Sequence, residues 1–244
     1  MRFDFGTITG EKLDEIKAIK EKRSLITAIE DARDGGVNPV IAEVKRKSPT
    51  LGDIRDVDPV KTAREMEEGG ACAISVLTDK HFDGGLYDLM RVKEAMKVPV
   101  LRKDFIVDEF QIYQSYGAGA DVVLLIVSLL KEKTKGFVEL IHGLGMEALV
   151  EVHCVDELGF ALDSDAKLIG VNNRDLGTLE IKLGTTKSLA GKIPGDRVIV
   201  SESGVNTTED LAYVLEAGAK AALIGTSIMQ AESIKEKVRE FVER

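Results

Sequence analysis

Charged side chains stand at the ends of several short apolar runs in this 244-residue sequence, at the points where buried strands would end. The run that begins at Val100 leads directly into a charged triplet containing Lys103, and the run "IAEVK" carries Glu43 and Lys45. Burying charge without a partner is costly, so charges at the ends of core strands need an explanation. Amines and carboxylates gathered in a small cavity shift each other's pKa values, which yields acids and bases suited to neutral pH.

The same pattern recurs further along the chain. Glu151 ends the run "EALVE", Asn172 and Arg174 lie two residues apart after "KLIGV", and Glu202 and Ser203 fall in "SESG" after "RVIV". Ion pairs that merely close the rim of the fold are one interpretation, since three acids and three bases balance. Buried ion pairs stabilise poorly compared with well-packed apolar side chains, which favours catalysis. The catalytic candidates are Glu43, Lys45, Lys103, Glu151, Asn172 and Glu202.

Eight apolar runs rich in Val, Ile and Leu recur at intervals of about 20–30 residues, the spacing of a repeated strand–helix unit. They are "VIAEV" from Val40, "CAISVL" from Cys72, "VPVL" from Val98, "DVVLLIV" from Asp121, "EALVEV" from Glu147, "KLIGV" from Lys167, "RVIV" from Arg197 and "AALIG" from Ala221. Segments with helical periodicity lie between them. In "DPVKTAREMEEGG", Pro59 lies near the start and Gly69 just past the end, and "NTTEDLAYVLEAGA" offers Asn206 or Thr207 as a cap.

This alternation predicts an α/β fold, a single (β/α)8 TIM barrel formed by residues 39–244. An open, doubly wound parallel sheet is the alternative. Such a sheet normally carries a Gly-rich phosphate motif after its first strand, and none follows Val44. In a barrel, active sites form at the carboxyl ends of the strands, so we expect the charged candidates to meet there.

Residues 1–38 precede the first strand and predict an N-terminal helical extension. The segments "EKLDEIKAIKEKR" and "SLITAIEDARDGG" read as two short amphipathic helices that end at Gly35 and Gly36. Two interpretations stay open for them: a plug over one end of the barrel, or a part in shaping the site. No linker or low-complexity segment divides the chain, so residues 1–244 are predicted to form one domain.

Two glycine-containing stretches after the last two strands predict a phosphate site. "SESGV" follows the seventh strand and "LIGTSIM" closes the eighth, where barrels commonly bind phosphate. Gly204, Gly225 and Thr226 would present backbone N–H groups there. A lone Gly after a strand is usually a turn, but two at these particular strands favour an anion site.

The histidines give weaker signals. His153 lies two residues beyond Glu151, but no HxxxH or HxH partner accompanies it, so we expect no metal site. His81 and His142 fall in predicted loop or helix and are expected to be solvated. Phe82, Phe105 and Leu124 are candidates for an apolar pocket, although ordinary core packing explains each of them equally well.

Composition excludes several classes of protein. The formal net charge of −9 disfavours a nucleic-acid partner, and no apolar stretch approaches the roughly 20 residues that span a membrane. The N-terminus is charged throughout and lacks the apolar core of a signal peptide. Cys72 and Cys154 form neither a disulfide framework nor a metal motif. A cytoplasmic protein with reduced cysteines is therefore expected.

Several motifs taken together resemble a known family. They are "IAEVKRKSP", "ISVLTDKHF", "VLRKDFIVDEFQIYQSYGAGADVVLLIV", "ALVEVH", "IGVNNRDL", "VSESGV" and "LIGTSIM". They are similar to those of indole-3-glycerol-phosphate synthases of tryptophan biosynthesis, and the resemblance covers essentially the whole chain. It implies conversion of 1-(2-carboxyphenylamino)-1-deoxyribulose 5-phosphate to indole-3-glycerol phosphate, carbon dioxide and water, without a metal or organic cofactor. Thr226 stands where Ser is common in the family.

The resemblance also implies roles for the catalytic candidates. Lys103 would protonate the carbonyl oxygen of the substrate chain during ring closure, with a pKa depressed by a dry cavity. Glu151 would act as acid and base in the dehydration. Lys45 would orient the substrate and supply a second acid. The remaining candidates, Glu43, Asn172 and Glu202, would hold these groups and contact the substrate's hydroxyls or amine.

Further positions would bind the substrate without taking part in proton transfer. Sugar-chain and anion recognition is implied for Ser48, Ser75, Arg174 and Ser203. The aromatic ring would face Phe82, Phe105 and Leu124, and the phosphate would lie at Gly204, Gly225 and Thr226.

Two rival functions remain to be weighed. The neighbouring isomerase of the pathway uses a Cys on the first strand, whereas here that strand carries Glu43 and Lys45. A non-catalytic sugar-phosphate binder could keep the fold, but it has little use for matched acids and bases. The partner we expect is a small phosphorylated substrate. We expect a monomer and leave association with other pathway enzymes open.

Overall fold

Eight parallel strands form a closed barrel in the computed structural model, which describes residues 21–48 and 52–243. Each of the eight predicted runs contains one strand. The strands are β1 (Val40–Val44), β4 (Ala73–Leu77), β5 (Val100–Lys103), β6 (Val122–Ile126), β7 (Glu147–Val152), β8 (Leu168–Asn172), β9 (Val198–Glu202) and β10 (Ala221–Ile224). The predicted (β/α)8 barrel is confirmed.

Closure distinguishes this sheet from the open alternative. The first strand, β1, pairs in parallel with the last, β10, through Ile41 and Leu223, and on its other side with β4, through Ile41 and Ala73. A doubly wound sheet would leave two edge strands, whereas here every barrel strand has two neighbours. The open-sheet alternative is therefore wrong.

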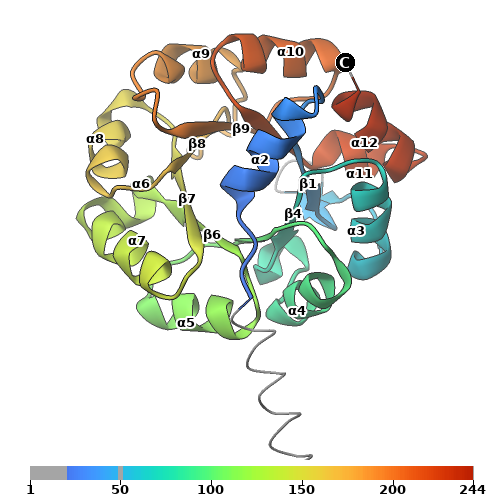
Figure 1. Ribbon diagram of the computed structural model, residues 1–244, viewed down its shortest axis with the longest axis horizontal. Helices are drawn as coiled ribbons and strands as arrows, with labels where there is room; N and C mark the ends of the chain where they lie inside the picture. The colour runs from blue at the N-terminus through green and yellow to red at the C-terminus, as the bar shows by residue number, and fades with distance from the viewer. Residues whose placement is uncertain (1–20, 49–51, 244) are drawn as a thin grey trace, which may run out of the picture.

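Helices surround the barrel in a ring (Figure 1). They are α3 (Pro59–Glu68), α4 (Leu86–Ala95), α5 (Glu109–Gly117), α6 (Val127–Leu130), α7 (Thr134–Gly143), α8 (Val155–Asp163), α9 (Gly184–Ala190), α10 (Thr208–Glu216), α11 (Thr226–Gln230) and α12 (Ile234–Val242). Their ends follow local chemistry. Pro59 opens α3 behind the cap Asp58, and Gly69 ends it. Thr207, one of the two caps offered by the sequence, forms a capping box with Asp210.

The barrel interior is layered. Alternate residues of the strands point inward, and the lower part of the interior is an apolar cluster that includes Ile41, Leu101, Leu124, Leu149 and Leu168. Along most of these strands, the next inward position, two residues further, carries a polar or charged group. The barrel thus has an apolar lower half and a polar upper end.

Helix α2 (Leu25–Asp34) closes the lower end of the barrel, lying across it in Figure 1. Its Leu25 and Ile29 join the apolar interior cluster. Glu147, at the start of β7, accepts hydrogen bonds from Ser24 Oγ at 2.6 Å and from the Leu25 backbone N–H at 2.7 Å. This helix acts as the predicted plug at the end opposite the site. The other predicted helix, residues 11–23, lies mostly outside the described residues.

Two features were not predicted from the sequence. A small antiparallel pair, β2 (Lys47–Ser48) and β3 (Gly52–Asp53), follows β1, and the 3₁₀ turns η1 (Lys80–Phe82) and η2 (Lys131–Lys133) extend two loops. Within the described ranges, no helix is long and apolar enough to cross a membrane.

Candidate active site

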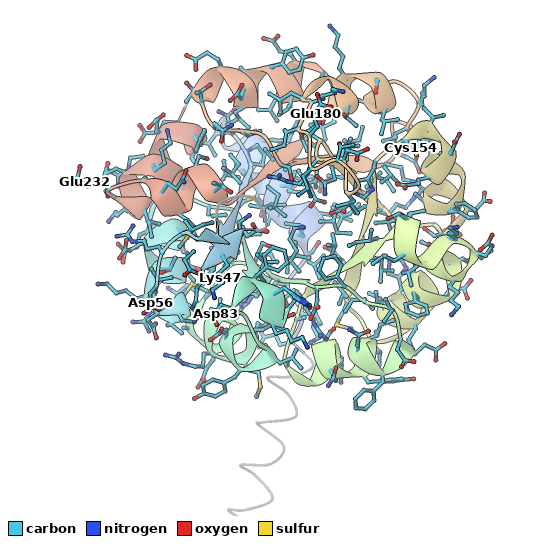
Figure 2. The ribbon with its side chains drawn as sticks, turned by 180° about the vertical axis from the view of Figure 1, so that it is seen from behind. Lys47, Asp56, Asp83, Cys154, Glu180 and Glu232 are labelled. Atoms are coloured by element: carbon cyan, nitrogen blue, oxygen red, sulfur yellow. The ribbon has the colours of Figure 1, made fainter. Side chains whose placement is uncertain are left out.

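A cavity of about 790 Å³ opens at the carboxyl ends of the strands. Figure 2 views the barrel from this side, opposite α2, with the labelled Lys47 on β2 and the labelled Asp83 and Glu180 on loops of this face. The cavity is lined by every residue that the sequence suggested as catalytic: Glu43, Lys45, Lys103, Glu151, Asn172 and Glu202. The barrel therefore brings them together as expected.

Lys103 lies at the centre of the charged cluster. It is the last residue of β5, and its Nζ atom lies 3.6 Å from Glu151 Oε2 and 3.4 Å from Glu202 Oε2. The Lys103 side chain is 17% exposed, whereas both carboxylates are 1% exposed. One ammonium thus reaches the cavity and pairs with two largely buried carboxylates that also line it.

The expected depression of the Lys103 pKa is wrong. Burial alone lowers this pKa, but the carboxylates of Glu202, Glu151 and Glu43 outweigh it and raise the pKa above the ordinary lysine value. Sequence reasoning considered the dry cavity but not the three converging negative charges. Lys103 is consequently protonated at neutral pH, which is the state an acid requires.

The two carboxylates beside Lys103 differ in their protonation behaviour. Burial and then the negative charge of Glu151 raise the pKa of Glu202 well above its usual range. Burial also acts to raise the pKa of Glu151, but Lys103 and His153 outweigh it and lower this pKa. The pKa values of these two neighbouring carboxyl groups thus move in opposite directions. Such a pair provides one ionised base, Glu151, and one group that can carry a proton, Glu202.

A second ion pair lies on β1 and just after it. Lys45 Nζ is 3.0 Å from Glu43 Oε1, and both side chains line the cavity. The Glu43 carboxylate packs directly against the end of β10, where a Cβ added to Gly225 would lie 2.5 Å from Glu43 Oε1. Gly225 therefore gives Glu43 room, a role that the sequence analysis did not foresee.

Gly170 is a further residue that sequence reasoning missed. It occupies an inward position of β8 beside Glu151 of β7, and a Cβ there would overlap the Glu202 carboxylate. Only glycine leaves space for the buried Glu202 side chain in its observed position. The glycine inside "KLIGV" was the available signal, since Gly in a strand often marks close approach of another group.

The apolar wall of the cavity differs in part from the expectation. Phe82 and Phe105 line the cavity together, with ring centroids 6.4 Å apart and planes 29° apart. Leu124 is 1% exposed, belongs to the buried apolar cluster and is not among the residues that line the cavity, so its contact with the substrate ring stays a prediction. Ile126, two residues further along the same face of β6, lines the cavity in its place.

The loop after β8 supplies apolar residues that the sequence analysis did not single out. Leu179 and Ile181 line the cavity and are 39% and 40% exposed. An isolated bridge between Arg174 and Ile181 folds this loop back toward the barrel. Such a contact depends on tertiary structure, so periodicity alone carried no signal for it.

The predicted sugar-binding residues are distributed unevenly. Arg174 and Ser203 line the cavity. Ser75 of β4 is the register partner of Glu43 but is fully buried and is not among the lining residues, and its hydroxyl has no hydrogen-bond partner among the described residues. The structure thus does not place Ser75 at the surface of the cavity. Ser48 belongs to β2, and its side chain lies outside what is described.

The predicted phosphate-binding residues Gly204, Gly225 and Thr226 all line the cavity, on the side of β9 and β10. Ser203 and Gly204 have φ angles of 65° and 93°, so the chain turns sharply in a conformation that favours glycine. A Cβ on Gly204 would also lie 2.6 Å from Ile181 Cγ2. At both Gly204 and Gly225, therefore, a side chain would collide with its neighbours.

The histidines are placed as follows. His81 and His142 are exposed, as expected. His153 lies behind Glu151, with Nε2 3.1 Å from Glu151 Oε1. In the part of the chain that the structure describes, no group of three or more His, Cys, Asp or Glu residues is arranged to hold a metal ion.

The closed barrel with acid–base pairs at its carboxyl end places the chain among the (β/α)8-barrel enzymes. Comparison with known proteins identifies the family: residues 7–241 match the model of the indole-3-glycerol phosphate synthases. The chain belongs to this family, whose members are carboxy-lyases of tryptophan biosynthesis. The resemblance inferred from the motifs is confirmed, and the rival isomerase is excluded.

Two named relatives support this assignment. The indole-3-glycerol phosphate synthase of Acetivibrio thermocellus is 51% identical over 212 residues, which cover 86% of this chain and 82% of the relative. That of Methanocaldococcus jannaschii is 47% identical over 235 residues, covering 95% and 88%.

Solved structures with low sequence identity support the fold alone. A thiamine phosphate pyrophosphorylase from Pyrococcus furiosus superposes with a TM-score of 0.61 at 16% identity, covering 84% of this chain and 93% of that one. An N-acetylmannosamine-6-phosphate 2-epimerase from Clostridium perfringens gives the same TM-score and identity, with coverage of 82% and 91%.

Proposed function

We propose that the cavity at the carboxyl end of the barrel carries out the synthase reaction, with Lys103 as the acid of ring closure. The observation that carries this proposal is the position of Lys103 Nζ, exposed to the cavity and held by two buried carboxylates. The substrate is 1-(2-carboxyphenylamino)-1-deoxyribulose 5-phosphate. The products are indole-3-glycerol phosphate, carbon dioxide and water.

In the first step, the ring carbon that bears the carboxylate attacks the carbonyl carbon of the ribulose chain. The carbonyl oxygen gains the electron pair of the broken π bond and takes a proton from Lys103. Carbon dioxide then leaves, and the electrons of the broken carbon–carbon bond restore the aromatic ring. Cyclisation itself activates this carbon for decarboxylation, so no metal is required for the step.

In the second step, the new hydroxyl takes a proton from an acid, the role open to Lys45, and leaves as water, while a proton is lost from the ring system to a base to complete the indole. Glu151 is the base of this dehydration, because its lowered pKa keeps the carboxylate ionised. Lys45 lines the same cavity directly after β1 and serves as a second acid or orients the substrate. Glu43, Asn172 and Glu202 hold these groups and contact the substrate's hydroxyls or amine.

Binding is divided between the two ends of the substrate. The paired rings of Phe82 and Phe105 form an apolar wall for the benzoate ring. Arg174 and Ser203 recognise the sugar chain and carboxylate, and the β9 and β10 loops hold the phosphate with Gly204 and Thr226. A grip at both ends aligns the attacking carbon with the carbonyl group.

Turnover can be followed directly because the chain contains no Trp. We expect indole fluorescence to grow when purified protein meets the substrate, without added metal and in the presence of a chelator. The measurement is emission against time at several enzyme concentrations. Unchanged emission at high enzyme concentration would contradict the enzyme assignment and favour the sugar-phosphate binder.

Thr226 offers a selective test of the phosphate site. Thr226→Glu places a carboxylate beside the phosphate, and we expect KM to rise far more than kcat falls, because phosphate is held alike in ground and transition states. Thr226→Ser is the matched control and should behave like the wild type. Gly225 is unsuitable for this test, since a side chain there meets Glu43. A defect confined to kcat in Thr226→Glu would count against this placement of the phosphate.

The proposal treats the chain as one catalytic domain that acts as a cytoplasmic monomer. Its support is that the residues assigned to proton transfer line one cavity within a single chain. Size-exclusion chromatography with light scattering measures this state directly.

A further inference from the structure

His153 occupies a position that the proposed reaction does not use. It follows the last residue of β7 and lies on the same face as Glu151 two residues earlier. Its side chain is 11% exposed, and it does not belong to the described residues that line the cavity. His153 therefore contacts the proposed base, Glu151, on a side that does not line the cavity, and of the two residues only Glu151 is placed to contact the substrate.

Both ring nitrogens of His153 face carboxylate oxygens. Nδ1 lies 3.1 Å from Glu157 Oε2 and hydrogen-bonds to it, and Nε2 lies 3.1 Å from Glu151 Oε1, at ion-pair distance but without hydrogen-bond geometry. A neutral imidazole that donates from Nδ1 to Glu157 would turn the lone pair of Nε2 toward the Glu151 carboxylate, whereas an imidazolium donates to Glu157 and attracts Glu151 by its charge. The geometry therefore fits the charged ring, provided that both carboxylates are ionised.

Glu157 fixes the orientation of this ring. It lies in the first turn of α8, and its Oε2 atom also accepts a 2.6 Å hydrogen bond from the backbone N–H of His153. One carboxylate oxygen thus holds both the main chain and the side chain of His153, which leaves Nε2 directed at Glu151. The start of α8 is thereby coupled to the active site.

We propose that His153 is a positioning residue, held as an imidazolium between Glu157 and Glu151, that keeps the Glu151 carboxylate ionised and aimed at the cavity. This inference rests on the proposed role of Glu151 as base. Electrostatics agree with the geometry: burial lowers the pKa of His153, but Glu151 and Glu157 outweigh it and raise the pKa to about 10. Lys103 is the other positive charge beside Glu151, 3.6 Å from its Oε2 atom; the pKa of Asp175, in the loop after β8, is lowered mainly by hydrogen bonds from Thr178 and Gly177 and least by His153.

The test compares His153→Gln with wild type and with His142→Gln, which changes an exposed histidine on α7. His153→Gln removes the positive charge, so the pKa of Glu151 rises and the acid limb of the kcat/KM profile moves to higher pH. We expect kcat at neutral pH to fall about tenfold or more, with KM nearly unchanged because substrate contacts remain. His142→Gln should match the wild type in all three quantities.

Glu157→Gln provides a second variant that leaves the ring in place. Without the Glu157 charge, His153 loses its proton at lower pH, so the alkaline limb should move to lower pH. If His153→Gln melts early, this shift decides the test. Wild-type profiles in the folded variants would overturn the inference. Glu151→Gln separates the two proposals: if it is inactive while the His153 and Glu157 variants behave like the wild type, only the positioning role fails, whereas full activity of Glu151→Gln overturns the proposed base itself.

Discussion

Lys103→Met should lower kcat by at least roughly 10²–10⁴-fold, the contribution typical of a positioned acid or base. Methionine keeps much of the length and the apolar stem of lysine but removes both the proton and the charge. The loss should appear in kcat, since Lys45, Arg174 and the phosphate loops still hold the substrate. Lost electrostatic stabilisation of the carbonyl oxygen would enlarge the effect. Steady-state kinetics on the fluorescence assay provide the measurement.

The same variant should lose stability in a pH-dependent way. Without Lys103, the carboxylates of Glu151 and Glu202 are buried together without the ammonium that pairs them, and removing one partner of a buried pair is destabilising. Their pKa values then rise above those in the unfolded chain, so stability is present at low pH and is lost as pH rises. The drop in melting temperature relative to wild type should be larger at pH 8 than at pH 5.

Lys192→Met is a matched control, because Lys192 is exposed in the loop after α9. It should keep wild-type kcat and melting temperature. A folded Lys103→Met enzyme within tenfold of the wild-type kcat would show that Lys103 is a structural rim charge.

The charged triplet Arg102, Lys103 and Asp104 at the end of β5 shows what could be predicted from the sequence. Period two separates its members: Lys103 points into the cavity, while Arg102 is 3% exposed and pairs outside the barrel with Asp104 at 2.8 Å and Ser115 at 2.9 Å. Alternation and barrel geometry were enough to select Lys103 as the functional charge. The apolar runs likewise placed all eight strands.

The features that could not be predicted from the sequence depend on how far along the barrel axis a residue lies and on which side chains of neighbouring strands it contacts. Leu124 and Ile126 share one face of β6, and period two does not say which of them reaches the cavity. The pKa of Lys103 depends on three carboxylates from three different strands. Gly170 matters because of the Glu202 side chain on the neighbouring strand. Each of these features follows from which strands lie side by side, which a single sequence does not display.

Glu151→Gln should also reduce kcat, by roughly 10²-fold or more, but at a later step than Lys103→Met. Glutamine keeps the shape of the side chain and can still face His153, but it cannot accept the proton released during dehydration. Ring closure and loss of carbon dioxide should still occur, so a ring-closed intermediate should accumulate. Rapid quench followed by chromatography would detect it. Glu139→Gln, an exposed change on α7, should leave all steps intact, and a Glu151→Gln enzyme with wild-type kcat would exclude Glu151 as the base.

Combining the two substitutions tests whether Lys103 and Glu151 act as one unit. Their charged atoms lie 3.6 Å apart, and each shifts the pKa of the other. Once Lys103 is gone, Glu151 loses the first step that precedes its own and the larger of the two charges, Lys103 and His153, that lower its pKa, so its further replacement removes little. The loss of kcat in the double variant should therefore be much smaller than the product of the two single losses, as happens when residues serve one catalytic site.

The effects of the two substitutions on the melting temperature should also be non-additive, because Glu151→Gln removes a buried negative charge that Lys103→Met leaves unpaired. We expect the double variant to melt above Lys103→Met at pH 8. Multiplicative kinetic losses and additive changes in melting temperature would show instead that the two side chains act independently.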